Sequence, residues 1–283
     1  MKLTTIHSGL FKLDGGAMFG VVPKQLWKRI NPPDDNNMCT WSMRCLLLEE
    51  GDRKILFDTG MGNKQGEKFR SHFEPHGPYD LIDSLKKAGV APSEITDVFI
   101  THYHFDHVGG AVKRNEKDEL VPTFENATYW SNQRHVDWAT TPNHRERASF
   151  LKENFKPLEE HGVLKTLPTR DVMTSWIPNI DVLFVDGHTE KMMIPHISIN
   201  GKTLVFCADL MPSAGHLGLP YVMAYDIRPL NTIAEKETFL KKAVEENYIL
   251  FLEHDAPTEC ITVTRNERGK FVADKEGSLE DFL

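Results

Sequence analysis

The sequence predicts an α/β protein in which a layered sheet core carries helices on its outside. Apolar runs of strand length alternate with stretches that have helical spacing of apolar residues. Strand-like runs recur in both halves of the 283 residues, and no Gly/Ser-rich or Pro-rich linker divides them. Strands from both halves are best buried as two sheets between helices, in a chain whose length allows one large domain.

The first elements that the sequence predicts are a β-hairpin and a helix. The runs 45–49 and 54–58 are apolar, and the intervening turn Glu50-Gly51-Asp52 supplies a glycine. Residues 80–88 place apolar side chains on one face of a helix. Gly89 then suits the position just beyond the end of that helix.

The remaining elements follow the same alternation. We expect strands at 97–101, 127–130, 182–185, 197–199, 203–207 and 249–252, and helices at 145–160 and 231–246. No stretch reaches the roughly 18 apolar residues of a membrane span, and the first residues lack a secretory signal pattern. These features predict a cytoplasmic protein with no membrane partner.

Composition narrows the classes of function. Asp and Glu number 41 against 33 Lys and Arg, which gives a net charge of −8. An acidic chain without a basic stripe argues against a nucleic-acid partner. The four cysteines lack both the paired spacing of zinc sites and the density of a disulfide framework. The 13 histidines are the count that stands out.

Histidines concentrate directly after one of the predicted strands, in the segment Thr101-His102-Tyr103-His104-Phe105-Asp106-His107-Val108-Gly109-Gly110. In extended backbone His102 and His104 share a face, and the turn that follows can present Asp106 and His107 to the same cavity. Imidazoles and carboxylates are ligands of Zn, Fe, Mn and Co. Because one strand cannot easily surround an ion, two ions completed by ligands from elsewhere in the chain are the better geometric solution.

This segment resembles the signature of the metallo-β-lactamase-fold hydrolases, and further landmarks of that family follow in order over most of the chain. They are Asp58 in Phe57-Asp58-Thr59-Gly60, His188 in Asp186-Gly187-His188-Thr189, Asp209 in Phe206-Cys207-Ala208-Asp209 and His254 in Glu253-His254-Asp255. The resemblance implies a four-layer αββα sandwich of two mixed sheets with outer helices. It also implies a single domain over 1–283, in which residues 1–40 form an N-terminal extension that covers the pocket or forms an interface.

The resemblance further implies a ligand set for two divalent metal ions. The first ion takes His102, His104 and His188, the second takes Asp106, His107 and His254, and Asp209 bridges both together with a water or hydroxide. Asp58 is expected to support one of the ligands from behind. Zinc is the expected metal, and Mn, Fe or Co are alternatives that nitrogen and oxygen ligands also accept.

Two adjacent cations suit hydrolysis, because they lower the pKa of a bridging water and polarise a carbonyl or phosphoryl oxygen. The expected mechanism is attack by the bridging hydroxide, with Asp106 helping to handle the proton. Tyr225 or Tyr221 is expected to donate a hydrogen bond to the oxyanion. His216 is expected to line the pocket from the glycine-containing loop 214–218.

Segments outside the metal signature indicate a branch of the family. Residues 14–24, Trp27, Met43-Arg44 and 222–226 with Pro229 resemble the acyl-homoserine-lactone lactonase and methyl-parathion-hydrolase branch. The leading prediction is a quorum-quenching type of lactonase or esterase that acts on a small lactone or ester, with a homodimer as an expected assembly. The alternatives are an organophosphate triester or phosphodiester hydrolase, a glyoxalase II-like thioesterase and a non-hydrolytic diiron redox protein.

Overall fold

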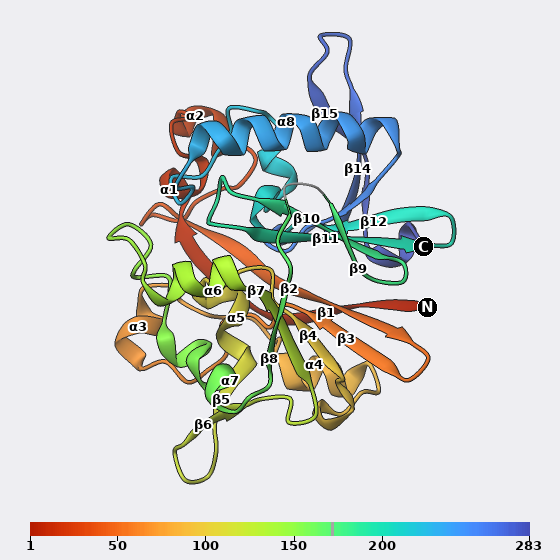
Figure 1. The fold of residues 1–283 in the computed structure, drawn as a ribbon. Helices are drawn as coiled ribbons and strands as arrows, with labels where there is room; N and C mark the ends of the chain where they lie inside the picture. The colour runs from red at the N-terminus through yellow and green to blue at the C-terminus, as the bar shows by residue number, and fades with distance from the viewer. Residues whose placement is uncertain (171–172) are drawn as a thin grey trace. The chain divides into compact units, whose positions relative to one another are not determined.

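The computed structural model describes residues 1–170 and 173–283 (Figure 1). The chain forms two compact units, the first made of Met1–Phe11 and Ser42–Thr169 and the second of Lys12–Trp41 and Arg170–Leu283. Each unit is built on one large mixed sheet with helices, so the predicted α/β class is confirmed. Among the described residues, no helix is both long enough and apolar enough to cross a bilayer.

The first unit holds a six-stranded sheet. Its strands are, in spatial order, β1 (Lys2–Asp14), β2 (Met38–Glu50), β3 (Arg53–Phe57), β4 (Asp97–Phe99), β7 (Thr128–Asn132) and β8 (Leu164–Leu167). The last residues of β1 and the first of β2 belong to the second unit. The antiparallel pair β2–β3 is the predicted hairpin, and β3, β4, β7 and β8 run parallel. The carboxyl ends of these parallel strands therefore meet at one edge of the sheet.

Short helices and a small hairpin complete this unit. They are α3 (Glu67–Ser71), α4 (Leu81–Lys87), α5 (Phe105–Val108), α6 (Gln133–Thr140) and α7 (Lys156–Glu160), with β5 (Val112–Arg114) paired to β6 (Leu120–Pro122). The predicted helix at 80–88 is α4. The side chain of Asp80 caps it by accepting the backbone N–H groups of Ile82 and Asp83, and Gly89 follows with a φ of +81°.

The predicted helix at 145–160 is wrong. The structure has a turn near 143–150, a 3₁₀ turn at Lys152–Asn154 and only then α7. The side-chain oxygen of Asn143 accepts the backbone N–H groups of Arg145 and Glu146, which favours a turn over a helix. Pro157 lacks the N–H that a helix interior needs and is tolerated in the first turn, which is where it lies in α7.

The second unit holds a seven-stranded sheet. Its strands, neighbours in chain order, are β9 (Thr174–Ile177), β10 (Ile180–Val185), β11 (Met192–Ile199), β12 (Lys202–Phe206), β13 (Ile249–Phe251), β14 (Cys260–Arg265) and β15 (Phe271–Gly277). β12 and β13 run parallel and the other neighbouring pairs run antiparallel. The predicted strands at 182–185, 197–199, 203–207 and 249–252 correspond to β10 to β13, and the last two each extend one residue past the end of the strand.

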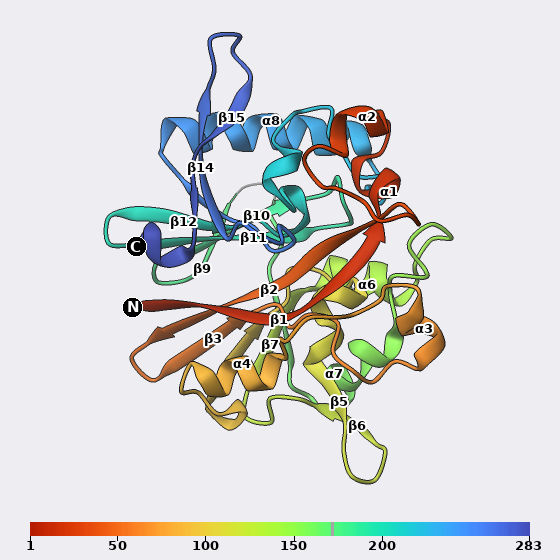
Figure 2. The ribbon, with the colours of Figure 1, turned by 180° about the vertical axis from the view of Figure 1, so that it is seen from behind.

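Three helices accompany this sheet, α1 (Gly15–Phe19), α2 (Lys24–Trp27) and α8 (Pro229–Glu245). α8 is the predicted helix at 231–246 and packs against β14, while the β14–β15 hairpin extends past it (Figure 2). Residues 1–40 divide between the units, because most of β1 belongs to the first and residues 12–40 to the second. That they cover a pocket or form an interface stays a prediction, as does a single domain over 1–283.

Candidate metal centre

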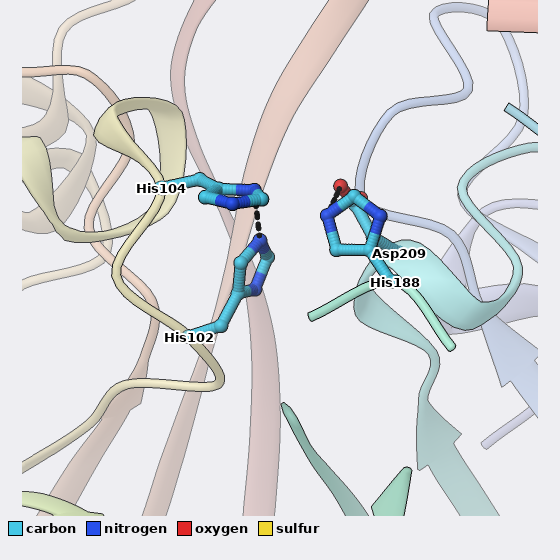
Figure 3. Close-up of side chains that lie close together, drawn as sticks. All are labelled: His102, His104, His188 and Asp209. Atoms are coloured by element: carbon cyan, nitrogen blue, oxygen red, sulfur yellow. Dashed lines mark hydrogen bonds and ion pairs between the residues drawn. The ribbon is translucent and has the colours of Figure 1, made fainter. Parts of the chain in front are cut away.

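The first unit turns two imidazoles toward each other directly after β4. Nε2 of His102 lies 3.1 Å from Nδ1 of His104 (Figure 3). Both side chains are buried. Two nitrogens bound to one tetrahedral zinc ion at about 2.1 Å would be about 3.4 Å apart. The pair therefore has nearly the spacing of two ligands of a single ion.

Asp58, at the end of β3, orients the rings of two histidines. Its carboxylate accepts the Thr101 backbone N–H at 2.8 Å and the Thr101 hydroxyl at 2.6 Å, and lies 3.1 Å from Nδ1 of His107. Because the hydroxyl donates to Asp58, it is an acceptor toward Nδ1 of His102 at 3.1 Å. Both rings then carry a proton on Nδ1 and keep a lone pair on Nε2, the form that binds a metal ion.

Helix α5 brings the other two candidate ligands of this unit together. Nε2 of His107 lies 3.8 Å from Oδ2 of Asp106, and both side chains are buried. The glycines after α5 allow close backbone approach, because a Cβ would lie 2.0 Å from the Met61 carbonyl oxygen if added to Gly109 and 2.2 Å from that of Thr59 if added to Gly110. This contact fixes the loop that follows Asp58 against α5.

The second unit places a carboxylate between two imidazoles. Oδ2 of Asp209 lies 3.0 Å from Nε2 of His188 (Figure 3), and Oδ1 lies 3.0 Å from Nε2 of His254. These residues follow β12, β10 and β13, and all are buried. Each oxygen of one carboxylate therefore faces a different ring, as expected of a ligand that bridges two ions.

His188 has a carboxylate at each ring nitrogen. Nδ1 lies 2.7 Å from Oδ1 of Asp226, opposite the contact with Asp209. Burial disfavours the charged ring, but the two carboxylates outweigh it and raise the pKa of His188 to about 10. A cation between Nε2 and Asp209 would replace one proton of this imidazolium, and Asp226 would retain the other on Nδ1. The donor set of this unit thus fits a divalent metal.

His216, predicted to line the pocket as a catalytic group, is engaged through both ring nitrogens. Nδ1 lies 2.8 Å from Oγ of Ser213, and Nε2 lies 2.9 Å from the carbonyl oxygen of Met18. The ring stacks on Phe19 with 4.7 Å between centroids, and burial lowers the pKa of His216 to about 3. These contacts hold the ring in place, and its predicted role as a catalytic residue that lines the pocket stays a prediction.

The two tyrosines considered for the oxyanion differ in their surroundings. Tyr225 has 36% of its surface exposed and stands one residue before Asp226. Tyr221 packs edge-on against Phe19, and its carbonyl oxygen accepts a hydrogen bond from the buried Lys236 at 2.9 Å. Tyr225 is the more exposed of the two, and its catalytic role stays a prediction.

Two buried residues of the first unit support the motif without having been singled out from the sequence. Nε2 of His135, on α6, accepts the backbone N–H of Tyr103 at 2.8 Å. Oε1 of Glu146 lies 3.6 Å from Nε2 of His104. Both stand more than 20 positions beyond the motif, so no local spacing connects them with it.

Supporting residues of the second unit were also missed. Glu235, on α8, accepts the backbone N–H groups of Asp186 at 2.8 Å and Gly187 at 3.0 Å, just before His188. Asp226 lies in the segment 222–226 that resembles the lactonase branch, which was the one available signal. The sequence of α8 gave no comparable signal for Glu235, because a glutamate on an amphipathic helix is ordinarily solvated.

Proteins with known names are similar to this chain over most of its length. An N-acyl homoserine lactonase from Bacillus thuringiensis is 22% identical over 236 residues, which are 79% of this chain and 84% of that protein. A probable metal-dependent hydrolase from Staphylococcus aureus is similar in structure with a TM-score of 0.87 and 26% identity, over 100% of this chain and 98% of the other.

AidC, a dizinc quorum-quenching lactonase solved with a product, has a TM-score of 0.79 at 21% identity, over 98% of this chain and 95% of its own. The family model of the metallo-beta-lactamase superfamily matches residues 44–254, a range that contains every candidate ligand. The predicted fold and the expectation of a metal-dependent hydrolase are confirmed. The chain belongs to the metallo-beta-lactamase superfamily.

Proposed function

We propose that this protein is a dinuclear metal-dependent lactonase or esterase, with acyl-homoserine-lactone type lactones as the leading substrate class. The observation that carries the dinuclear part is the Asp209 carboxylate, whose two oxygens each lie 3.0 Å from a different imidazole. The substrate class is supported by the lactonases among the relatives and by the sequence segments that resemble that branch.

The proposed ligand set is the one that the sequence resemblance implies. The first ion takes His102, His104 and His188, the second takes Asp106, His107 and His254, and Asp209 serves both. Zinc is the proposed metal, because imidazole and carboxylate ligands suit it and a dizinc enzyme is among the similar structures. Asp58 is proposed to support this set through its contacts with His107 and Thr101.

The residues of the chain would divide the chemistry as follows. Two divalent cations, when bound, supply a water that loses its proton near neutral pH and a Lewis acid for the substrate carbonyl oxygen. Asp58 and Asp226 hold the Nδ1 protons of His107 and His188, which keeps the Nε2 lone pairs directed at the ligand positions. Asp106 is proposed to accept the proton of the attacking water on the carboxylate oxygen that would not bind the ion, and to return it to the leaving alkoxide.

The proposal also includes an oxyanion donor, the kind of substrate, the location and the assembly of the protein. Tyr225 is proposed to donate a hydrogen bond to the carbonyl oxygen of the substrate. The substrate is a small neutral molecule, and no nucleic acid is expected because the net charge is −8. A cytoplasmic location and a homodimer complete the proposal.

A substrate panel tests the proposed activity. Metal-defined protein should hydrolyse acyl-homoserine lactones with a higher kcat/KM than aryl esters, paraoxon-type triesters or glutathione thioesters. The activity should disappear on chelation and return when zinc is added back, because the attacking water depends on the cations. Lactone turnover at background, with efficient cleavage of a triester or thioester, would contradict the lactonase assignment.

A further inference from the structure

A buried carboxylate lies on the side of His104 that faces away from His102. Nδ1 of His104 lies 3.1 Å from His102, while Nε2 lies 3.6 Å from Oε1 of Glu146. Glu146 is 3% exposed and His104 is 6% exposed, so little solvent reaches either side chain. A carboxylate is rarely buried to this degree without a specific partner.

Two side chains hold Glu146 in place. Its Oε2 accepts the indole N–H of Trp138 at 2.8 Å and an amide N–H of Asn143 at 2.5 Å. The backbone N–H of Glu146 donates to the amide oxygen of Asn143 at 3.1 Å. The structure has a turn where the sequence predicted a helix at 145–160. This turn places the Glu146 carboxylate beside His104 and fixes its orientation.

The ring of His104 is held as well. Phe150 packs against it with 4.8 Å between ring centroids, and His102 meets it edge-on. Packing fixes the orientation of the ring. It does not decide which of the two ring nitrogens carries the proton. His102 and His107 keep a lone pair on Nε2, whereas His104 turns Nδ1 toward His102. If both rings bind one ion, His104 binds it through Nδ1 and needs its proton on Nε2.

We propose that Glu146 is the positioning residue that keeps the proton of His104 on Nε2 and so leaves the lone pair on Nδ1 free for a metal ion. The proposal rests on the proposed function in that His104 is taken as a ligand. A separation of 3.6 Å exceeds a direct hydrogen bond, so the carboxylate acts through its charge across a short gap. Such a charge acts strongly where water is excluded.

The first test uses the zinc-loaded protein. Imidazole ¹⁵N spectra should show the proton of His104 on Nε2, and Glu146→Gln should shift the Nε2–H resonance, because the carboxylate charge no longer faces it. Glu160→Gln changes an exposed glutamate nearby in the sequence and should leave the spectrum unchanged. An unchanged Nε2–H resonance of His104 in Glu146→Gln would overturn the proposal.

The second test measures zinc affinity by competition with a chromophoric chelator. Loss of a supporting partner typically weakens metal affinity about 10–100-fold, which is the change expected for Glu146→Gln. Trp138→Phe keeps the charge but removes one donor to Oε2, so it should weaken zinc binding less and also serves if the Gln variant does not fold. Wild-type affinity in both variants would overturn the role of Glu146. A wild-type protein that binds no zinc would contradict the proposed function instead.

Discussion

At the scale of single residues, the partners of the histidines explain what each ring can do. His102, His107 and His188 each have an acceptor at Nδ1, supplied by Thr101, Asp58 and Asp226. The five proposed ligand histidines could be singled out from the sequence because each follows an apolar strand in a recognisable order. Their partners could not, apart from Asp58, because they are joined to the ligands only by tertiary structure.

His196 makes stability depend on pH, although it has no place in the proposed chemistry. It is buried on β11, and burial lowers its pKa to about 4 from 6.5. Between these values the unfolded chain binds a proton that the folded chain does not. The free energy of unfolding should therefore fall as the pH drops from about 6.5 to about 4, by about 1.4 kcal/mol per pH unit from this residue.

Urea unfolding at several pH values between 7 and 4 measures this contribution. The variant His196→Gln should show a smaller loss of stability with falling pH than the wild-type protein. Comparing the two slopes removes contributions that both proteins share, including proton binding by the candidate metal ligands. Equal slopes would mean that His196 is protonated in the folded protein as readily as in the unfolded chain.

At the scale of the elements, predictions succeeded where local signals and packing agreed. α4 has Asp80 at its start and Gly89 after its end, and the β2–β3 hairpin has its turn glycine. The interpretation failed at 145–160, where the side-chain contacts of Asn143 and the missing N–H of Pro157 outweighed helical spacing. β1 was not predicted, because its apolar residues, among them the buried Ile6, Phe11 and Leu13, do not alternate regularly with its polar residues.

α8 is expected to stabilise the loop that carries His188. Glu235 accepts two backbone N–H groups of that loop, and Gly187 lies so close to Thr232 that an added Cβ would be 2.3 Å from the hydroxyl oxygen. Glu235→Ala removes the acceptor of both bonds and should lower the free energy of unfolding by about 2 kcal/mol, below the sum of two hydrogen bonds to a charged group at about 1.5–3 kcal/mol each, because Glu235 is only half-buried.

Chemical denaturation compares this variant with Glu245→Ala, which removes an exposed glutamate from the same helix. The control should change stability by less than about 0.5 kcal/mol. If Glu235→Ala were no more destabilised than the control, α8 would not hold the loop through this side chain.

At the scale of the whole molecule, the order of the landmarks was the most predictable property. The family model spans 44–254 and so includes the motif at 102–107 as well as His188, Asp209 and His254. The 13 histidines differ in their environments. His135, His196 and His216 are buried but lie outside the proposed ligand set, and their contacts are with packed side chains and the backbone. Substrate choice depends on side chains that no spacing in the sequence identifies.

The central claim is that the chain holds two metal ions and that Asp209 is shared by both. Elemental analysis of protein purified with zinc, then freed of loosely bound ions, measures this directly. We expect close to two zinc ions per chain, and clearly fewer in Asp209→Asn, whose amide nitrogen cannot replace a carboxylate oxygen as a ligand. The exposed variant Asp181→Asn should retain the wild-type content. One zinc ion or none in the wild-type protein, or an unchanged content in Asp209→Asn, would contradict the account.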